Sequence, residues 1–221
     1  MKKVKFKNGF IKITYIIALL FLIGCVRKVP LEKGIVLQTD ALNKTNSSIL
    51  VVMDKSSSEK VIVFKPGPFS DKFSLNGGES IESNILSFVS SQFQEVDFAN
   101  ELSENNKSYD YYLKIDWKDY KIDMGKTIFS DTKTNLYIDY IFMNSKDNVL
   151  FTTVTDGNSV ERLSGQAIAT AINPFAFIAT KKAEELIANS WNEALTNSIS
   201  QFGIQLQDYA NTFSFNYSKK K

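Results

Sequence analysis

The sequence predicts an α+β fold, in which an antiparallel or mixed sheet of about four to six strands carries two main helices on one face. Two segments, 111–117 and 136–142, alternate apolar and polar residues as half-buried strands do. Two others, 81–89 and 183–199, repeat apolar residues with the period of an amphipathic helix. The order β-β-α-β-β-β-β-α favours an antiparallel or mixed sheet with its helices on one side.

The first half of the chain contains two apolar runs of strand length and one helix. Residues 49–53 are continuously apolar, and residues 61–64 form a second run after a serine-rich turn at 54–60. A helix that ends near Phe93 follows the pair Gly77-Gly78. Its buried face is expected to contain Ile81, Ile85, Phe88 and Val89.

Four strands are expected in the middle of the chain, a short one at Val96 and Phe98 and three longer ones. The clearest begins at Tyr111, where apolar residues alternate with charged ones. A polar turn at 144–148 joins the strand at 136–142 to a return strand that starts at Val149, which predicts an antiparallel hairpin. The turn formers Asp156-Gly157-Asn158 are expected to end the return strand.

The segment 167–179 is apolar and rich in alanine, and Pro174 prevents one uninterrupted helix through it. It is either a packed crossover or a surface segment that touches a membrane or a partner, and the packed crossover is the favoured interpretation. The residues that would make such a contact are Ile168, Ile172, Phe175 and Phe177.

Residues 181–202 form the best predicted helix, with one continuous apolar stripe. Thr180 is expected to cap its N-terminus and Gly203 to stop it. Residues 204–221 then form one more strand or a loose tail.

The N-terminal region has the order of a secretory signal peptide. Five lysines precede an apolar run at 13–23, which is shorter than the roughly 20 residues that a spanning helix needs. The run ends in Leu22-Ile23-Gly24-Cys25, and Cys25 is the only cysteine. This ending resembles the lipobox of bacterial lipoproteins, in which a signal peptidase recognises the residues before the cysteine and the cysteine is acylated, for example with palmitate.

The resemblance to a lipobox implies three parts of the chain. Residues 1–24 would be a cleaved signal peptide, residues 25–46 the lipidated N-terminus and a tether, and residues 47–221 a single α+β globular domain. The short apolar patch Ile35-Val36-Leu37 is either part of the tether or an edge strand of the domain.

Loss of the signal peptide changes the charge of the protein. No acidic residue precedes Cys25, so the 26 basic groups fall by five to 21 against 24 acidic groups, and the net charge falls from +2 to −3. A nucleic-acid partner is therefore not expected, because phosphate binding needs a basic face.

The residue types that are absent restrict the chemistry. The chain has no histidine, and its only cysteine is assigned to lipid. Ser-His-Asp and Cys-His catalytic arrangements cannot be built, and neither can zinc sites that use these ligands. The sequence therefore predicts a protein that is not an enzyme and that carries no cofactor or metal.

Carboxylates crowd the central strands. They are Asp110, Asp116, Asp119, Asp123 and Asp139. Two of them could form an acid–base pair, as in glycoside hydrolysis, or all could belong to a solvated sheet face. Alternation with Lys114, Lys118 and Lys121 favours the solvated face, because opposite charges on neighbouring strands stabilise it.

Two other groups of residues are weaker candidates for a site. The spacing of Asp147, Asn148, Asp156 and Asn158 does not match a calcium-binding EF-hand loop, and they are expected to be turn residues. Five aromatic residues could line a ligand groove between sheet and helix, although aromatic residues at this spacing more often form core. They are Tyr111, Trp117, Tyr137, Tyr140 and Trp191.

Three segments resemble YajG-type and transport-auxiliary lipoproteins of the bacterial envelope. They are residues 109–115 (YDYYLKI), residues 144–151 (NSKDNVLF) and residues 191–202 (WNEALTNSISQF). The resemblance lies in the order of elements and their hydrophobic spacing. It implies a non-enzymatic envelope component, an accessory to transport or assembly, and it assigns no functional residue besides Cys25.

The expected function is that of a lipid-anchored cell-envelope protein that binds another envelope protein. The alternatives are a surface glycan hydrolase that uses carboxylates, and a protein that binds a lipid or other apolar ligand. Val26 stands where an aspartate would favour retention in the inner membrane, so the outer membrane, on its periplasmic face or its surface, is the preferred location.

Overall fold

Two sheets and two long helices build the part of the chain that the structure describes. This computed structural model describes residues 26–34, 45–65, 71–104, 107–124, 131–161 and 176–218. In chain order the elements are β1 (Val26–Lys28), β2 (Thr45–Met53), α2 (Lys55–Ser58), β3 (Ile62–Phe64), β4 (Lys72–Leu75), α3 (Gly77–Gln92), β5 (Phe93–Ala99), the 3₁₀ turn η1 (Leu102–Glu104), β6 (Tyr111–Met124), β7 (Thr132–Asn144), β8 (Val149–Glu161) and α5 (Ala176–Ser218).

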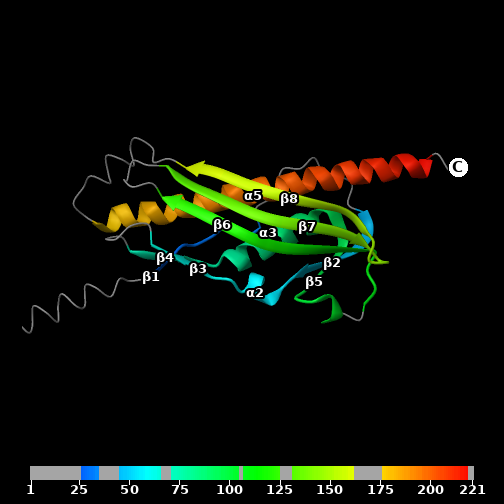
Figure 1. The fold of residues 1–221 in the computed structure, drawn as a ribbon, viewed down its shortest axis with the longest axis horizontal. Coiled ribbons are helices and arrows are strands. Elements are labelled where there is room, and N and C mark those ends of the chain that lie inside the picture. Colours follow the sequence, from blue (N-terminus) through cyan, green and yellow to red (C-terminus); the bar gives the residue numbers. More distant parts are fainter. Residues whose placement is uncertain are drawn as a thin grey trace, which may run out of the picture.

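The larger sheet has five strands in the order β5-β2-β6-β7-β8. Strand β2 runs parallel to both β5 and β6, whereas β6, β7 and β8 form an antiparallel meander. The meander strands are long and lie in front of α5 in the view of Figure 1. The expected α+β class and mixed sheet are confirmed.

A bulge in β6 changes which side chains face the core. Leu113, Ile115 and Trp117 are buried on the inner face, and the pairing with β7 shifts between Trp117 and Asp119. After this bulge Tyr120 and Ile122 take the inward positions, packed against the core. A bulge adds one residue to one strand, so the alternation of faces moves by one position.

Helix α5 packs against the inner face of β7 and β8 through small residues. A Cβ atom added to Gly157 in β8 would lie 2.1 Å from the carbonyl oxygen of Ala194 in α5. The Ser190 hydroxyl donates to Thr134 Oγ1 at 2.7 Å, and Ser159 and Ser190 Oγ atoms are 2.7 Å apart. Small side chains and buried hydroxyl pairs therefore bring the helix close to the sheet.

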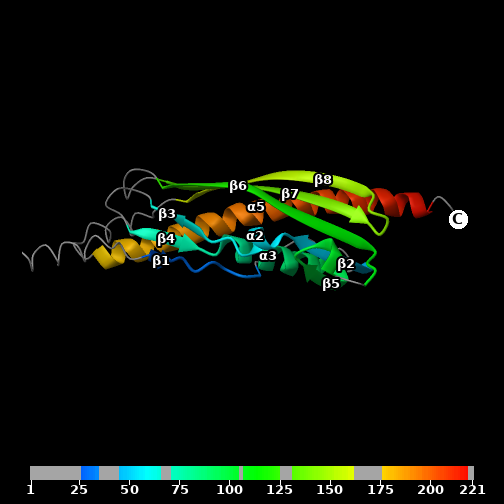
Figure 2. The ribbon, with the colours of Figure 1, turned by 60° about the horizontal axis from the view of Figure 1, so that its bottom comes forward.

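The core lies between the larger sheet and a second layer. That layer contains α3 and a three-stranded sheet in the order β1-β4-β3. Figure 2 shows β6, β7 and β8 on one side, with α3 and the small sheet on the other. Side chains of both sheets, α3 and α5 join one apolar cluster, in which Trp191 is fully buried.

The first described residues belong to the folded domain, which differs from the predicted tether. Strand β1 pairs in parallel with β4, and the Val29 amide donates to the Ser74 carbonyl at 2.8 Å. Val29 is buried in the core. Strand β1 has only three residues, and most residues of this segment are basic or turn-forming, so the sequence pattern does not indicate a strand here. Residues 35–44, with the patch Ile35–Leu37, lie outside the described residues.

Two other local predictions are corrected. The turn predicted at 54–60 contains a short helix, α2, because the Asp54 side chain caps it by accepting from the Ser56 amide at 3.0 Å. Strand β8 continues past Asp156-Gly157-Asn158 to Glu161, held there by its pairing with β7.

The last helix is longer at both ends than expected. It runs from Ala176 to Ser218, so Thr180 is not its cap and Gly203 does not stop it. Gly203 is buried in the helix interior beside Phe88, and residues 204–218 are helical instead of forming a strand or a tail. Tertiary packing overrides the local preference of glycine for helix ends.

Candidate functional site

The segment that follows β1 crosses one face of α5 and is fixed at both ends. Arg27 donates from Nε to Asp71 at 2.6 Å, and its guanidinium lies 3.7 Å from a carboxylate oxygen of Glu184 in α5. Further along, Asn84 of α3 donates to the carbonyl of Glu32 at 3.1 Å. These contacts hold residues 30–32 against the helix.

An open cleft of about 400 Å³ lies between this segment and α5. Residues of α5 three, four and seven apart line it, because such spacing places side chains on one helical face. The lining consists of Pro30, Leu31, Glu32, Lys181, Glu184, Glu185, Ala188, Asn189 and Asn192. Three of these nine residues are apolar and six are polar or charged, whereas small-molecule sites are lined predominantly by apolar side chains.

The cleft carries more acidic than basic side chains. Glu32, Glu184 and Glu185 line it, against Lys181 alone. Glu184 is close to Arg27, while the carboxylates of Glu32 and Glu185 form no ion pair among the described residues. The lining therefore presents net negative charge.

Asn192 is the unusual residue of this cleft. The residue is only 8% exposed, yet its Oδ1 atom has no hydrogen-bond partner among the described residues. Nearby buried polar groups of α5 do have partners: Trp191 donates from Nε1 to Ser80 Oγ at 3.2 Å. A buried acceptor without a donor costs about 1–3 kcal/mol of stability.

A second exposed feature is β8, the end strand of the five-stranded sheet. Its valines Val149, Val154 and Val160 are 57%, 69% and 52% exposed. Side chains of α5 already occupy part of its outer edge. Asn197 donates to the Asn158 carbonyl at 2.7 Å, and Gln201 donates to the Asp156 carbonyl at 3.3 Å.

The residues that the sequence connects with the membrane lie almost entirely outside the described residues. These are Leu22, Ile23, Gly24 and Cys25, together with Ile168, Ile172 and Phe175. Phe177 lies in the first turn of α5, where only the backbone is described. None of the helices in the described part of the chain is long and apolar enough to span a membrane.

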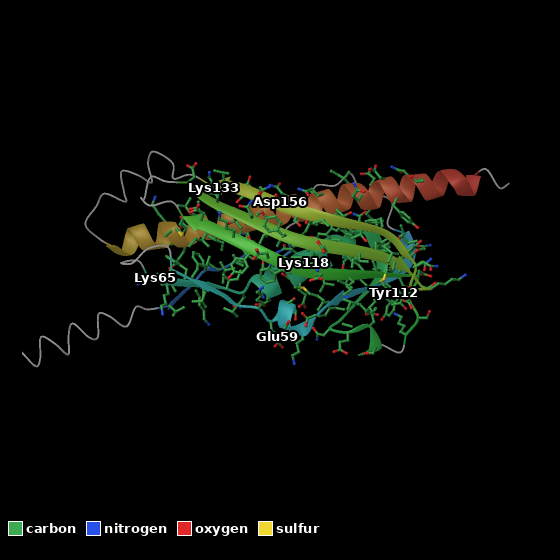
Figure 3. The ribbon with its side chains drawn as sticks, viewed as in Figure 1. Glu59, Lys65, Tyr112, Lys118, Lys133 and Asp156 are labelled. Carbon is green, nitrogen blue, oxygen red and sulfur yellow. The ribbon has the colours of Figure 1, made fainter. Side chains whose placement is uncertain are left out.

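The predicted carboxylates lie on the outer face of the large sheet, away from the cleft. Asp116 and Asp139 are cross-strand neighbours, and the Lys118 ammonium pairs with both. Figure 3 looks onto this face and shows Lys118 on β6. The hydrogen bond to Asp116 raises the pKa of Lys118 above its usual range. Asp110 instead accepts from the Ser48 amide at 2.9 Å. The preferred interpretation, a charged sheet face, is the one that this geometry supports.

The aromatic residues divide between two faces of the sheet. Trp117 and Trp191 meet edge to face with ring centroids 5.9 Å apart, and Tyr140 stacks on Phe202 at 4.6 Å. Burial raises the pKa of the Tyr140 hydroxyl well above its usual value. Tyr111 stacks on Phe142, whereas Tyr137 is exposed. The predicted groove is therefore filled by packed core around Trp117 and Trp191.

The predicted calcium ligands occupy separate parts of one hairpin. Asp147 and Asn148 lie in the turn between β7 and β8, where Asn144 accepts from the amides of Lys146 and Asn148. Asp156 and Asn158 lie within β8. In the part of the chain that the structure describes, no cluster of three acidic, histidine or cysteine residues could hold a metal ion.

Sequence reasoning missed the cleft because its two walls are far apart in the chain. One signal was available: Asn192 directly follows Trp191 and lies at the edge of the apolar stripe of the predicted helix. A polar residue at such a position is buried only if something compensates it. No pattern in the sequence indicates that Arg27 and Asn84 fix the position of residues 30–32.

No protein-family model and no curated protein matches this chain. Its fold is similar to that of several solved structures. A DUF330 protein from Xanthomonas campestris has a TM-score of 0.47 and 12% identity, with 83% of this chain and 98% of that chain covered. A minor lipoprotein from Acinetobacter baumannii has a TM-score of 0.37 and 6% identity, with 76% and 95% covered. Uncharacterized lipoprotein B from Nitrosomonas europaea has a TM-score of 0.34 and 9% identity, with 77% and 95% covered.

Proposed function

We propose that this protein is a lipid-anchored component of the cell envelope, and that its domain is a non-enzymatic module that binds another envelope protein. Its lipid is attached at Cys25, and the outer membrane is its proposed location. The proposal combines the lipobox-like ending at Cys25 with one structural observation, the exposed end strand β8.

A partner could contact both the backbone and the apolar side chains of strand β8. An end strand presents unpaired amide and carbonyl groups to another chain. Among the described side chains, Asn197 and Gln201 engage the carbonyls of Asn158 and Asp156. Residues 149–154 of this edge are the proposed docking surface. The exposed valines beside it supply side-chain contacts, as in peptide recognition by strand addition.

The geometry of the carboxylates supports a binding role over hydrolysis. Asp116 and Asp139 share Lys118 on an open sheet face, and neither lines the cleft. A glycosidase needs two carboxylates on opposite sides of a bound sugar.

Photo-crosslinking in cells tests the docking surface. A photoreactive amino acid at Val154 is expected to give a discrete adduct with one envelope protein. The matched control is Ile204, which is 58% exposed on α5 and belongs to no strand. Equal adducts at both positions, or no adduct at Val154, would contradict docking at β8.

Metabolic labelling with a fatty-acid analogue tests the anchor. The wild-type chain is expected to be labelled and to sediment with membranes, whereas Cys25→Ala is expected to remain an unlabelled, uncleaved precursor. Label incorporated into Cys25→Ala would refute lipidation at this residue.

A further inference from the structure

We infer that the outer face of the small sheet β1-β4-β3 contacts an anionic lipid surface. The inference goes beyond the proposed protein partner at β8, and only the choice of a membrane as the occupant rests on the proposed lipid at Cys25. This face combines lysines that have no carboxylate beside them, exposed valines, and a position next to Cys25 in the chain.

The pairing of the three strands divides their side chains between two faces. Ile62, Phe73 and Leu75 point inward and are buried in the core. Residues that alternate with them point outward, because successive side chains of a strand lie on opposite faces. This outward set, in the strands and directly flanking β3, is called the basic face and consists of Val26, Lys28, Val61, Val63, Lys65, Lys72 and Ser74.

The charges of the basic face all have one sign. Lys28, Lys65 and Lys72 are exposed, and none of them forms an ion pair among the described residues. Asp71, the carboxylate next to Lys72, instead pairs with Arg27, whose side chain alternates with those of the basic face. The face is therefore a local region of positive charge on a protein whose predicted mature chain is net negative.

Two of these lysines lie on neighbouring strands, directly opposite each other. Phe64 of β3 pairs with Phe73 of β4, which places the next residue, Lys65, opposite Lys72. Like charges at such positions destabilise a sheet, and a strand spacing of about 4.8 Å is well inside the Debye length of about 8 Å at physiological salt. In the large sheet, by contrast, Lys118 pairs with two aspartates. An anionic group outside the small sheet would relieve the repulsion.

Exposed valines lie among the lysines of the basic face. Val26, Val61 and Val63 are 53%, 53% and 55% exposed. Lysines next to exposed apolar side chains suit a bilayer surface, because the charges attract anionic headgroups and the apolar side chains enter the interface. A purely electrostatic partner such as a nucleic acid would make no use of the valines.

The basic face lies where a lipid at Cys25 would bring it to the bilayer. Cys25 directly precedes Val26, and consecutive Cα atoms are about 3.8 Å apart. Val26 pairs with Lys72, and Lys65 lies one strand further, about 10 Å from Val26. Figure 3 shows Lys65 at the end of the molecule where the small sheet lies. Near an anionic surface each lysine adds roughly fivefold to the affinity, so the face would strengthen the anchor.

Lysine footprinting of the full chain on vesicles tests the inference. Phosphatidylcholine vesicles are compared with vesicles that also contain phosphatidylglycerol, and mass spectrometry follows the acetylation rate of each lysine. Lys28, Lys65 and Lys72 should react at least about fivefold more slowly on the anionic vesicles. About 1 M salt should abolish this protection, because the Debye length falls to about 3 Å. Lys114 and Lys146, which are exposed on β6 and in the turn between β7 and β8, should react equally on both. Equal rates on both vesicles for the three lysines of the basic face overturn the inference.

A double variant separates attraction by charge from mere closeness to the membrane. In Lys65→Gln/Lys72→Gln, the acetylation rate of Lys28 on anionic vesicles should return to its value on phosphatidylcholine. Lys114→Gln/Lys121→Gln changes the net charge equally at exposed positions of β6, and it should leave Lys28 protected. Melting temperatures of both variants should match the wild type, since all four side chains are exposed. Protection of Lys28 that persists in the first variant, or that is lost in both, contradicts the inference.

Flotation of the same samples reports on the anchor separately. A chain that floats with both kinds of vesicle but shows equal lysine rates keeps the lipid at Cys25 and rules out the membrane as the occupant of the basic face. A chain that floats only with anionic vesicles, and only while Lys65 and Lys72 are present, supports the basic face and contradicts the lipid at Cys25.

Discussion

Gly157 and the hydroxyl residues around it decide how closely α5 approaches the sheet. Ser198 Oγ lies 3.1 Å from the Tyr140 hydroxyl and 2.5 Å from Thr155 Oγ1, and all three groups are buried. Each hydroxyl can both donate and accept, so these three groups stay paired at a short distance between helix and strand. Larger side chains at this contact would separate the two elements.

The first prediction concerns Gly157. The substitution Gly157→Ala places a Cβ atom 2.1 Å from the Ala194 carbonyl oxygen, so the helix or the strand must move. We expect a loss of about 1–3 kcal/mol in the free energy of unfolding, as in other overpacked interiors. Urea denaturation measures this loss. Thr152→Ala, at an exposed position of the same strand, should change stability far less.

The second prediction concerns the pH dependence of stability near Asp97. Hydrogen bonds from the Tyr109 hydroxyl, at 2.6 Å, and from Lys107 lower the pKa of Asp97 below its unfolded value of 3.8. The stabilisation is therefore present above pH 3.8 and is lost as the pH falls through the lower, folded pKa. Asp97→Asn should thus be less stable than the wild type at pH 7, by about 1 kcal/mol or less because Asp97 is partly exposed.

The difference between wild type and Asp97→Asn should shrink as the pH falls through the lowered folded pKa of Asp97, below which both side chains are neutral. Denaturation curves at several pH values measure it. Asp208→Asn, at an exposed site on α5, is the control and should show no such trend. A difference that stays constant with pH would show that Asp97 acts through its shape and not through its charge.

At the scale of elements, α5 connects the two layers of the molecule. Its 43 residues extend about 65 Å, and Figure 1 shows it running along most of the long axis. Trp191 packs against Trp117 of the large sheet and donates to Ser80 of α3. A Cβ atom on Gly77 would touch both tryptophan rings at 2.9 Å, so the space around Trp191 is fully occupied.

The third prediction follows from this position of Trp191. Trp191→Ala should lower the free energy of unfolding by about 3–5 kcal/mol, because it empties a large, well-packed volume. Ile204→Ala changes an apolar residue of the same helix that is 58% exposed, and it should cost well under 1 kcal/mol. Similar losses for the two variants would show that α5 is not held at Trp191.

Elements with strong periodicity could be predicted from sequence, and those fixed by tertiary contacts could not. The alternation from Tyr111 to Trp117 and the stripe around Trp191 placed β6 and the middle of α5 correctly. Glycine usually marks a break in a strand or helix, and Gly157 and Gly203 are exceptions. The close approach of the Ala194 backbone requires glycine at position 157, and Gly203 packs tightly beside Phe88. The cleft depends on residues 30–32 meeting α5, a contact between distant segments that local patterns do not encode.

At the scale of the whole molecule, the predicted lipid and the folded domain are directly adjacent. Val26 follows Cys25 and already pairs with Lys72 of β4. The start of β1, the end of β8 and the start of α5 all lie toward one end of the molecule in Figure 1. If Cys25 is lipidated, that end faces the bilayer, and the C-terminal part of α5 points away from it.

The last prediction tests this orientation. Lys65 is two strands from β1, about 10 Å away, and Figure 3 shows it at the same end of the molecule. Because Cys25 is the only native cysteine and is predicted to carry lipid, Lys65→Cys or Asp208→Cys supplies a unique thiol for a fluorophore. On vesicles with spin-labelled headgroups, the dye at position 65 should be quenched strongly and the dye at position 208 weakly. A flexible insertion between Cys25 and Val26 should reduce the difference, and equal quenching without the insertion would contradict the proposed orientation.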